Sequence, residues 1–204
     1  MFICIITLLH LKKLLFLASA ILLLSACSPL TELTALRKCE FRLLSIQDPE
    51  VCGVDMSQKS SWSDFNFMEA QAVAGQLMKK KLPLEVTVNV EALNPGSSLA
   101  AVNSLQWIAF LDDLQLAQGS VQQRVEIGPS GGTALIPIRV RADLFDYLEG
   151  NNPTSMLNFA LNLLNAGNGV SQVSMKIKPS IRIGNKDLKY PDYFAISKAY
   201  SSGN

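Results

Sequence analysis

The sequence predicts a mainly β fold of antiparallel strands, with one or two packed helices. Residues 82–141 alternate apolar and polar side chains with a period of two, which is typical of strands with one solvent-exposed face. The turns between these segments are short, as at Asp112-Asp113 and at 128–132, and short turns join antiparallel strands. Only 66–81 and 153–166 show a helical period over several turns.

The clearest strand is 84–91, whose apolar face consists of Leu84, Val86, Val88 and Val90. The other predicted strands are 39–47, 102–111, 114–117, 121–127, 133–141, 169–178 and 180–183. We expect 102–111 and 114–117 to form one hairpin, and 121–127 and 133–141 to form the next pair. The turn at Gly184-Asn185 predicts a final hairpin, and the aromatic stretch 190–194 is expected to pack across the sheet.

A helix is predicted to begin after Asn66, because Glu69 follows three residues later in the pattern of a capping box. Its expected apolar stripe consists of Phe67, Ala70, Ala74, Leu77 and Met78. Lys79-Lys80-Lys81 suit the negative end of the helix dipole. A contact with anionic lipid or polysaccharide is the alternative interpretation of these lysines.

The second predicted helix runs between the N-cap and N1 pair Asn152-Pro153 and the stop at Gly167. Its polar residues are only asparagines, at 158, 162 and 165. A helix this apolar is expected to lie against the core of its own domain, with a partner or a membrane as the alternative.

The N-terminus predicts export. Lys12-Lys13 precede the apolar run 14–24, and Leu24-Ser25-Ala26-Cys27 follows. This last motif resembles the lipobox of bacterial lipoproteins, which implies cleavage after residue 26 and acylation of Cys27. We therefore expect 1–26 to be a lipoprotein signal peptide, 27–38 a tether and 39–200 a single domain. A plain signal peptide or an uncleaved anchor remains the alternative.

The same resemblance implies a location in the bacterial cell envelope. By similarity to Gram-negative lipoproteins, Ser28 after the cysteine suggests an outer-membrane lipoprotein that faces the periplasm. In a Gram-positive host, the corresponding place would be the outer face of the plasma membrane. The expected partner is the membrane, through the lipid anchor.

Two thiols remain after Cys27 and the signal segment are set aside, namely Cys39 and Cys52. Because the exported compartment is expected to be oxidising, the sequence predicts a disulfide between them. Such a bridge would close a loop of roughly a dozen residues and stabilise the fold by about 2–3 kcal/mol. Pairing with another chain is the alternative if the two thiols are free.

Composition disfavours nucleic-acid binding. The expected mature chain loses two of the 18 basic residues and none of the 17 acidic ones, so it is close to neutral. Binding to nucleic acid requires clustered cations that displace counterions from phosphates. We therefore expect no nucleic-acid partner.

Catalysis and cofactors are also disfavoured. The sole histidine, His10, lies in the signal segment, so the mature chain offers no catalytic triad with histidine and too few ligands for a zinc site. The Gly-rich turn 128–132 lacks the Lys-Ser/Thr of a phosphate loop. Three carboxylates at 143, 146 and 149 are interpreted as a solvated helix face rather than a calcium site. We expect no catalytic residues, cofactor or metal.

Several motifs in order resemble the late-embryogenesis-abundant group 2, or water-stress and hypersensitive-response (WHy), domain. They are Asn94-Pro95, Leu105-Gln-Trp107, Leu111-Asp-Asp113, Leu116-Ala-Gln-Gly119 and the alternating run 134–140. The resemblance covers about residues 40–183, and Gly96 stands where the family usually has a second asparagine. It implies an antiparallel β-sandwich of fibronectin-III-like shape, an association with stress such as water loss, and no catalytic residues.

The leading functional prediction is a lipid-anchored, non-enzymatic envelope protein with a stress-protective or envelope-maintaining role. One alternative is a binding module that holds a lipid or another apolar ligand between the sheet and the helix 153–166. Another is a subunit of an envelope complex that uses a free sheet edge. A filled core favours the first, a cavity of several hundred Å³ the second, and a long unpaired edge strand the third.

Overall fold

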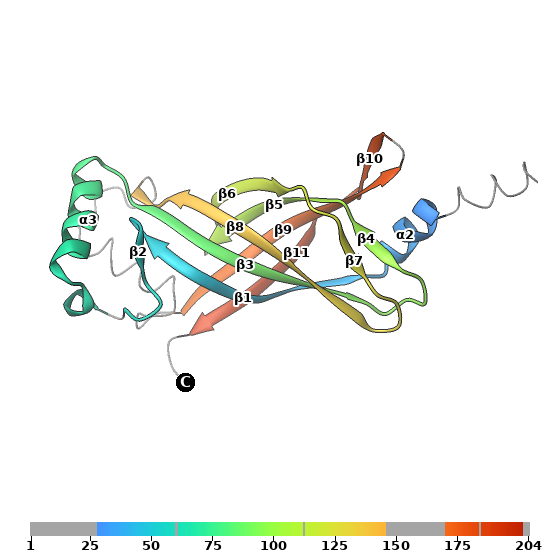
Figure 1. The fold of residues 1–204 in the computed structure, drawn as a ribbon, viewed down its shortest axis with the longest axis horizontal. Coiled ribbons are helices and arrows are strands. Elements are labelled where there is room, and N and C mark those ends of the chain that lie inside the picture. Colours follow the sequence, from blue (N-terminus) through green and yellow to red (C-terminus); the bar gives the residue numbers. More distant parts are fainter. Residues whose placement is uncertain (1–27, 60, 112, 146–169, 184, 202–204) are drawn as a thin grey trace, which may run out of the picture.

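A computed structural model describes residues 28–201, except for 60, 112, 146–169 and 184. Two antiparallel sheets pack face to face in an elongated molecule (Figure 1). The predicted fold class, a mainly β antiparallel sandwich with packed helices, is therefore confirmed. The predicted helix 153–166, residues 146 and 149, and Cys27 lie outside the described residues.

The first sheet has the strand order β2-β1-β3-β8. Its strands are β1 (Glu40–Val51), β2 (Val54–Asp55), β3 (Pro83–Asn94) and β8 (Gly132–Asp143). The long central strand β3 pairs with β8 over its whole length, from Pro83 opposite Asp143 to Asn94 opposite Gly132. The irregular register between Gln47 and Glu50 in β1 accommodates Asp48 and Pro49 as a bulge.

The second sheet has the order β10-β9-β5-β6, and β11 also pairs with β9. Its strands are β5 (Ser104–Leu111), β6 (Leu114–Val121), β9 (Val170–Ile183), β10 (Lys186–Lys189) and β11 (Phe194–Ser201). A separate pair joins β4 (Ala100–Val102) to β7 (Val125–Ile127). The helical elements are α2 (Ser28–Leu36), the 3-10 turn η1 (Trp62–Asp64) and α3 (Phe67–Met78).

The core lies between the sheets and follows the alternation seen in the sequence. The predicted apolar face of 84–91 is buried, and so are Leu105, Trp107, Ala109 and Leu111 of β5. Among the described residues, a void of about 20 Å³ lies between the sheets; the side chains that line it include Val86, Ala109 and Val173. A void this small holds about one water molecule, so the described interior is filled.

Two of the family-like motifs have structural roles. The Asn94 side chain is fully buried, and its Nδ2 donates hydrogen bonds to the carbonyl oxygens of Ser98 (2.8 Å) and Ile127 (3.2 Å). Its Oδ1 accepts from the Gly96 amide at 3.0 Å. One asparagine thus holds the chain after β3 against β7. Trp107 lies directly opposite Gly119 on β6, where a Cβ atom would come within 2.6 Å of the indole ring.

Helix α3 confirms the predicted N-terminus but not the predicted buried stripe. The Asn66 side chain accepts from the Glu69 amide at 3.0 Å, and the Glu69 carboxylate accepts from the Asn66 amide at 2.9 Å. Val73 is the buried residue of the helix, whereas Phe67 and Met78 are 80 % and 87 % exposed. The predicted stripe is therefore wrong at Phe67, Ala74 and Met78, which are all exposed.

Helix α2 replaces the tether that was expected at 27–38. Ala35 and Leu36 are buried, and the helix packs against β4 and β9. Arg124 pairs with Glu32 at 3.1 Å, and this hydrogen bond is the largest cause that raises the pKa of the guanidinium. Residues 28–36 are therefore part of the domain.

The strand pairing differs from the prediction in three places. Strand β7 pairs with β4 rather than with β8, which pairs with β3. Strand β9 runs without a break through Pro179, although we expected two strands there. The prediction also missed β11, whose Phe194 packs on Phe41 with ring centroids 5.0 Å apart. The hairpin after β9 is confirmed.

Candidate functional site

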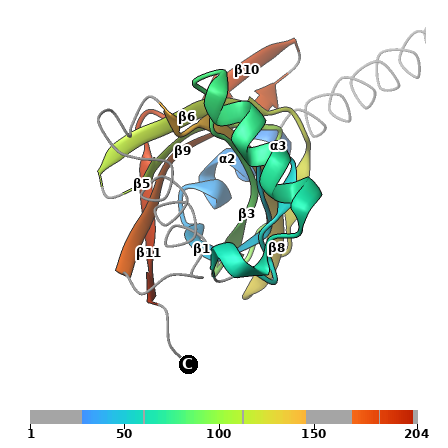
Figure 2. The same cartoon turned by 90° about the vertical axis from the view of Figure 1, so that its left-hand side faces the viewer.

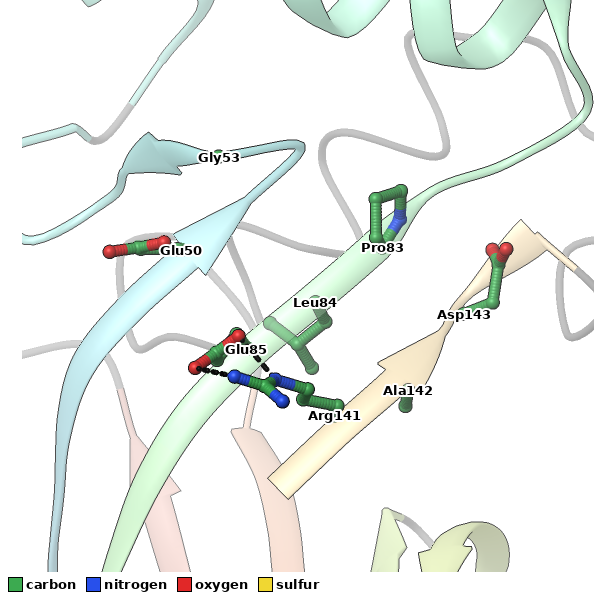
Figure 3. Close-up of a pocket in the computed structure, with 8 residues that line it drawn as sticks. All are labelled: Glu50, Gly53, Pro83, Leu84, Glu85, Arg141, Ala142 and Asp143. Carbon is green, nitrogen blue, oxygen red and sulfur yellow. Dashed lines mark hydrogen bonds and ion pairs between the residues drawn. The ribbon is translucent and has the colours of Figure 1, made fainter. Parts of the chain in front are cut away.

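An open groove crosses the first sheet at the end nearest α3 (Figure 3). Its volume is about 420 Å³, and its walls come from the end of β1, the turn into β2, the start of β3 and the end of β8. The lining residues are Glu50, Gly53, Pro83, Leu84, Glu85, Arg141, Ala142 and Asp143. Adjacent antiparallel strands therefore bring together residues almost sixty positions apart in the chain.

The charged centre of the groove is the pair formed by Glu85 and Arg141. These residues face each other directly across the β3–β8 ladder, with Nε to Oε2 at 2.6 Å and Nη2 to Oε1 at 3.1 Å (Figure 3). Arg139 approaches the same carboxylate at 3.3 Å. The hydrogen bond from Arg141 is the main cause that lowers the pKa of Glu85, followed by the charges of both arginines. Glu85 is therefore ionised and fully engaged at neutral pH.

Asp143 has a structural role at the other wall of the groove. Its Oδ1 accepts hydrogen bonds from the backbone amides of Leu82 (2.7 Å) and Phe145 (3.1 Å). These bonds fix the start of β3 against the end of β8. The carboxylate oxygen is thus used to satisfy buried backbone donors, as folded chains require.

Cys52 lies beside the groove in the tight turn between β1 and β2. Cys52 and Gly53 have φ angles of 54° and 76°, the left-handed pair typical of a two-residue hairpin. The Cys52 amide donates to the Pro83 carbonyl at 2.8 Å. Burial, with a smaller effect from Asp143, raises the pKa of its thiol to about 11. The thiol is thus protonated at neutral pH and is a poor nucleophile.

The predicted disulfide between Cys39 and Cys52 is contradicted. Both thiols are free, and the two residues flank the twelve-residue strand β1 at its opposite ends. An extended strand rises about 3.3 Å per residue, so roughly 40 Å separates them. A disulfide requires Cα atoms within about 7 Å of each other. The Cys39 thiol instead donates to the Ala35 carbonyl at 3.6 Å and ties β1 to α2.

The groove was not predicted because sequence alone gives no strand register. Glu85, Arg139 and Arg141 were visible as polar positions of alternating strands, but β8 was assigned to the wrong neighbour. The signal that could have found the site is complementary charge on the solvent faces of two strands. In the part of the chain that the structure describes, no cluster of three metal-ligating side chains occurs, and no helix is long and apolar enough to cross a bilayer.

The chain matches no protein-family model and no curated protein. Three solved structures are similar at low level. A protein from Archaeoglobus fulgidus has 14 % identity and a TM-score of 0.35, over 79 % of this chain and 98 % of that one. A protein assigned to the late embryogenesis abundant (LEA) class has 11 % identity and a TM-score of 0.39, over 94 % of this chain and 90 % of that one. An Arabidopsis thaliana protein has 12 % identity and a TM-score of 0.34, over 59 % of this chain and 68 % of that one.

Neither a fold family nor a shared function follows from these likenesses. All three TM-scores lie below 0.5 and all identities below 25 %. Glu85 and Arg141 pair with each other, Asp143 accepts hydrogen bonds from the backbone, and the nearby Cys52 thiol is protonated. The groove is therefore a polar surface feature to which we assign no reaction.

Proposed function

We propose that this protein is a lipid-anchored, non-enzymatic component of the bacterial cell envelope with a stress-protective or envelope-maintaining role. The observation that carries the proposal is the lipobox-like Leu24-Ser25-Ala26-Cys27, placed immediately before the first helix of the domain. An acyl group on Cys27 would hold the sandwich directly at a bilayer, because α2 docks on the sheet rather than forming a free linker. The proposed location is the outer membrane, facing the periplasm.

Two further observations support a role without catalysis. The family-like residues Asn94, Trp107 and Gly119 maintain the fold, so the resemblance to WHy domains rests on architecture rather than on a reactive site. The void between the described parts of the two sheets is far smaller than the roughly 300 Å³ of a small ligand pocket. The lipid-binding alternative places its ligand against the helix 153–166, which lies outside the described residues.

Metabolic labelling with an alkyne fatty acid tests the anchor. The wild-type chain should carry the label and fractionate with the outer membrane, whereas Cys27→Ser should carry none, because the thiol is the acyl acceptor. Cys52→Ser is the matched control and should be labelled like the wild type. Label that persists in Cys27→Ser would refute the assignment.

The physiological role needs a second measurement. A strain that lacks the protein should survive drying or osmotic shock less well than its parent. Cys27→Ser, if still folded and exported, should fail to restore survival because it is not held at the membrane. Equal survival of all strains would leave the anchor intact but contradict the protective role.

A further inference from the structure

Helix α3 presents an apolar, uncharged face to solvent. Phe67, Met68 and Met78 are 80 %, 71 % and 87 % exposed, whereas the other exposed large apolar residues of the described chain reach at most 48 %. Phe67, Gln71, Ala74 and Met78 lie on one stripe, and all four are exposed. A surface helix of a soluble domain normally places charged residues on its outward face.

The one charged residue within α3 does not belong to this face. Glu69 is partly buried, and its carboxylate pairs with Lys59 at 2.8 Å. That hydrogen bond is the main cause that lowers the pKa of Glu69. The outward face therefore has no carboxylate that would repel an anionic surface.

Three lysines follow the apolar stripe directly. Lys79, Lys80 and Lys81 are exposed, and none of them forms an ion pair within the described residues. Their backbone caps the C-terminus of the helix. The Lys80 amide donates a hydrogen bond to the Leu77 carbonyl oxygen (2.9 Å), and the Lys81 amide donates to the Gln76 carbonyl oxygen (3.0 Å). This is the Schellman arrangement, in which the residue at the position of Lys80 is usually glycine.

Lys80 adopts that left-handed conformation at φ 55° in spite of its side chain. A residue other than glycine is strained in this region. Lys80 is the middle residue of the three lysines, so a change to glycine removes one positive charge and relieves the backbone strain at the same time.

We propose that the outward face of α3, together with Lys79-Lys80-Lys81, is a docking surface for an anionic phospholipid bilayer. The apolar side chains would enter the interface between headgroups and acyl chains, while the lysines attract the anionic headgroups. Helix α3 forms one end of the molecule, opposite to α2, and faces the viewer in Figure 2. The contact is thus distinct from an acyl anchor on Cys27 and does not depend on it.

Vesicle sedimentation with the chain that begins at Ser28 tests this surface without an acyl group. The described core lies between Ala35 and Ile196, so this chain retains all of it. It should bind vesicles of equal parts phosphatidylglycerol and phosphatidylcholine more tightly than vesicles of phosphatidylcholine alone. Added salt should weaken the binding, because it screens exposed charges.

The variants Phe67→Ser and Met78→Ser should each weaken binding to the anionic vesicles about tenfold and leave the melting temperature unchanged. Leu135→Ser, which changes an apolar residue of β8 that is 48 % exposed, is the matched control and should bind like the wild type. If all three variants bind equally, or if the wild type does not bind, the proposal is overturned.

Lys80→Gly gives the sharpest test, because its two effects have opposite signs. Removing the charge should weaken vesicle binding about fivefold, which corresponds to about 1 kcal/mol for a lysine near an anionic surface. Relief of the left-handed strain should raise the melting temperature. Ser130→Gly, at φ 56°, is the control: it should also raise the melting temperature but leave binding unchanged.

Self-association is the competing use of the same face. If the wild type forms dimers that Met78→Ser abolishes, and does not sediment with vesicles, the surface joins two copies of this chain and the lipid proposal is wrong. Unchanged vesicle binding by Lys80→Gly at low salt would likewise contradict a role for the lysines.

Discussion

Cys39 and Cys52 both have thiols that the fold keeps protonated. Burial raises the pKa of each from its ordinary value of 9.0 to about 11, and Asp143 contributes at Cys52. The native chain consequently retains protons between pH 9 and 11 that the unfolded chain has lost. The stability contributed by the neutral thiols is fully present below pH 9 and declines as the pH rises through this range.

This linkage predicts that the unfolding free energy of the chain from Ser28 falls between pH 9 and 11 more steeply than that of Cys39→Ala/Cys52→Ala. Urea denaturation at matched pH values measures the difference. All other ionisable groups are the same in both proteins, so the double variant is the control. At pH 8 the native thiols should react slowly with a thiol reagent and rapidly in urea. Equal rates in the two states would contradict the protonated, shielded thiols.

The two cysteines also show which property of single residues the sequence could not predict, namely the distance between them. The expected oxidising compartment and the count of two thiols favoured a disulfide, but neither of them gives a distance between the two residues. Once β1 extends through 40–51, its length forbids the bridge. Glu85 and Arg141 are in contact although the sequence did not predict it, because their contact depends on a strand register that the sequence does not encode locally.

At the scale of elements, local sequence patterns predicted where strands and helices lie, but they did not predict which strands pair with each other. The period-two alternation located β3 and β5, and the Asn66–Glu69 box located the start of α3, because both depend on neighbours in sequence. The pairing of β4 with β7 was missed, because nothing local distinguishes β8 from β4 as a partner for β7. Strand β11 was missed because its polar residues mask its alternation, although Ile196 is buried.

A pair of glycine substitutions tests the elements with opposite expected signs. At Gly119 a Cβ atom would meet the Trp107 ring at 2.6 Å, so Gly119→Ala should destabilise the sandwich by about 1–3 kcal/mol through overpacking. At Gly75, in the middle of α3, a Cβ would meet nothing within 4 Å. Gly75→Ala should therefore stabilise the protein by about 0.5–1 kcal/mol. Denaturant midpoints measure both changes, and a neutral Gly119→Ala would refute the Trp107 packing.

At the scale of the whole molecule, the two helices mark opposite ends of the long axis (Figure 1). The proposed acyl anchor precedes α2, and the proposed lipid surface lies on α3. The chain between them is a sandwich whose described interior is filled and whose exposed groove contains the ion pair of Glu85 and Arg141. The two ends therefore carry the proposed contacts with lipid, while the body between them separates and orients those ends.

The filled interior leads to the last prediction, which separates a structural sandwich from a lipid carrier. Leu84 is 2 % exposed and borders both the void between the sheets and the groove. If the interior is a packed core, Leu84→Ala should cost about 2–5 kcal/mol, because the residual cavity adds to the lost burial. Leu135→Ala, at an exposed position of β8, should change stability by less than about 0.5 kcal/mol.

The same two variants should also have the same lipid content after purification. Solvent extraction followed by mass spectrometry of the chain from Ser28 should find no stoichiometric lipid in the wild type or in either variant, because the void of about 20 Å³ between the described parts of the sheets cannot hold an acyl chain. A ligand cavity would behave differently: Leu84→Ala would cost little stability, since the side chain would line a space already open, but would alter the amount of lipid retained. One bound lipid per wild-type chain, lost in Leu84→Ala without a change in the denaturant midpoint, would replace the structural interpretation with the lipid-carrier one.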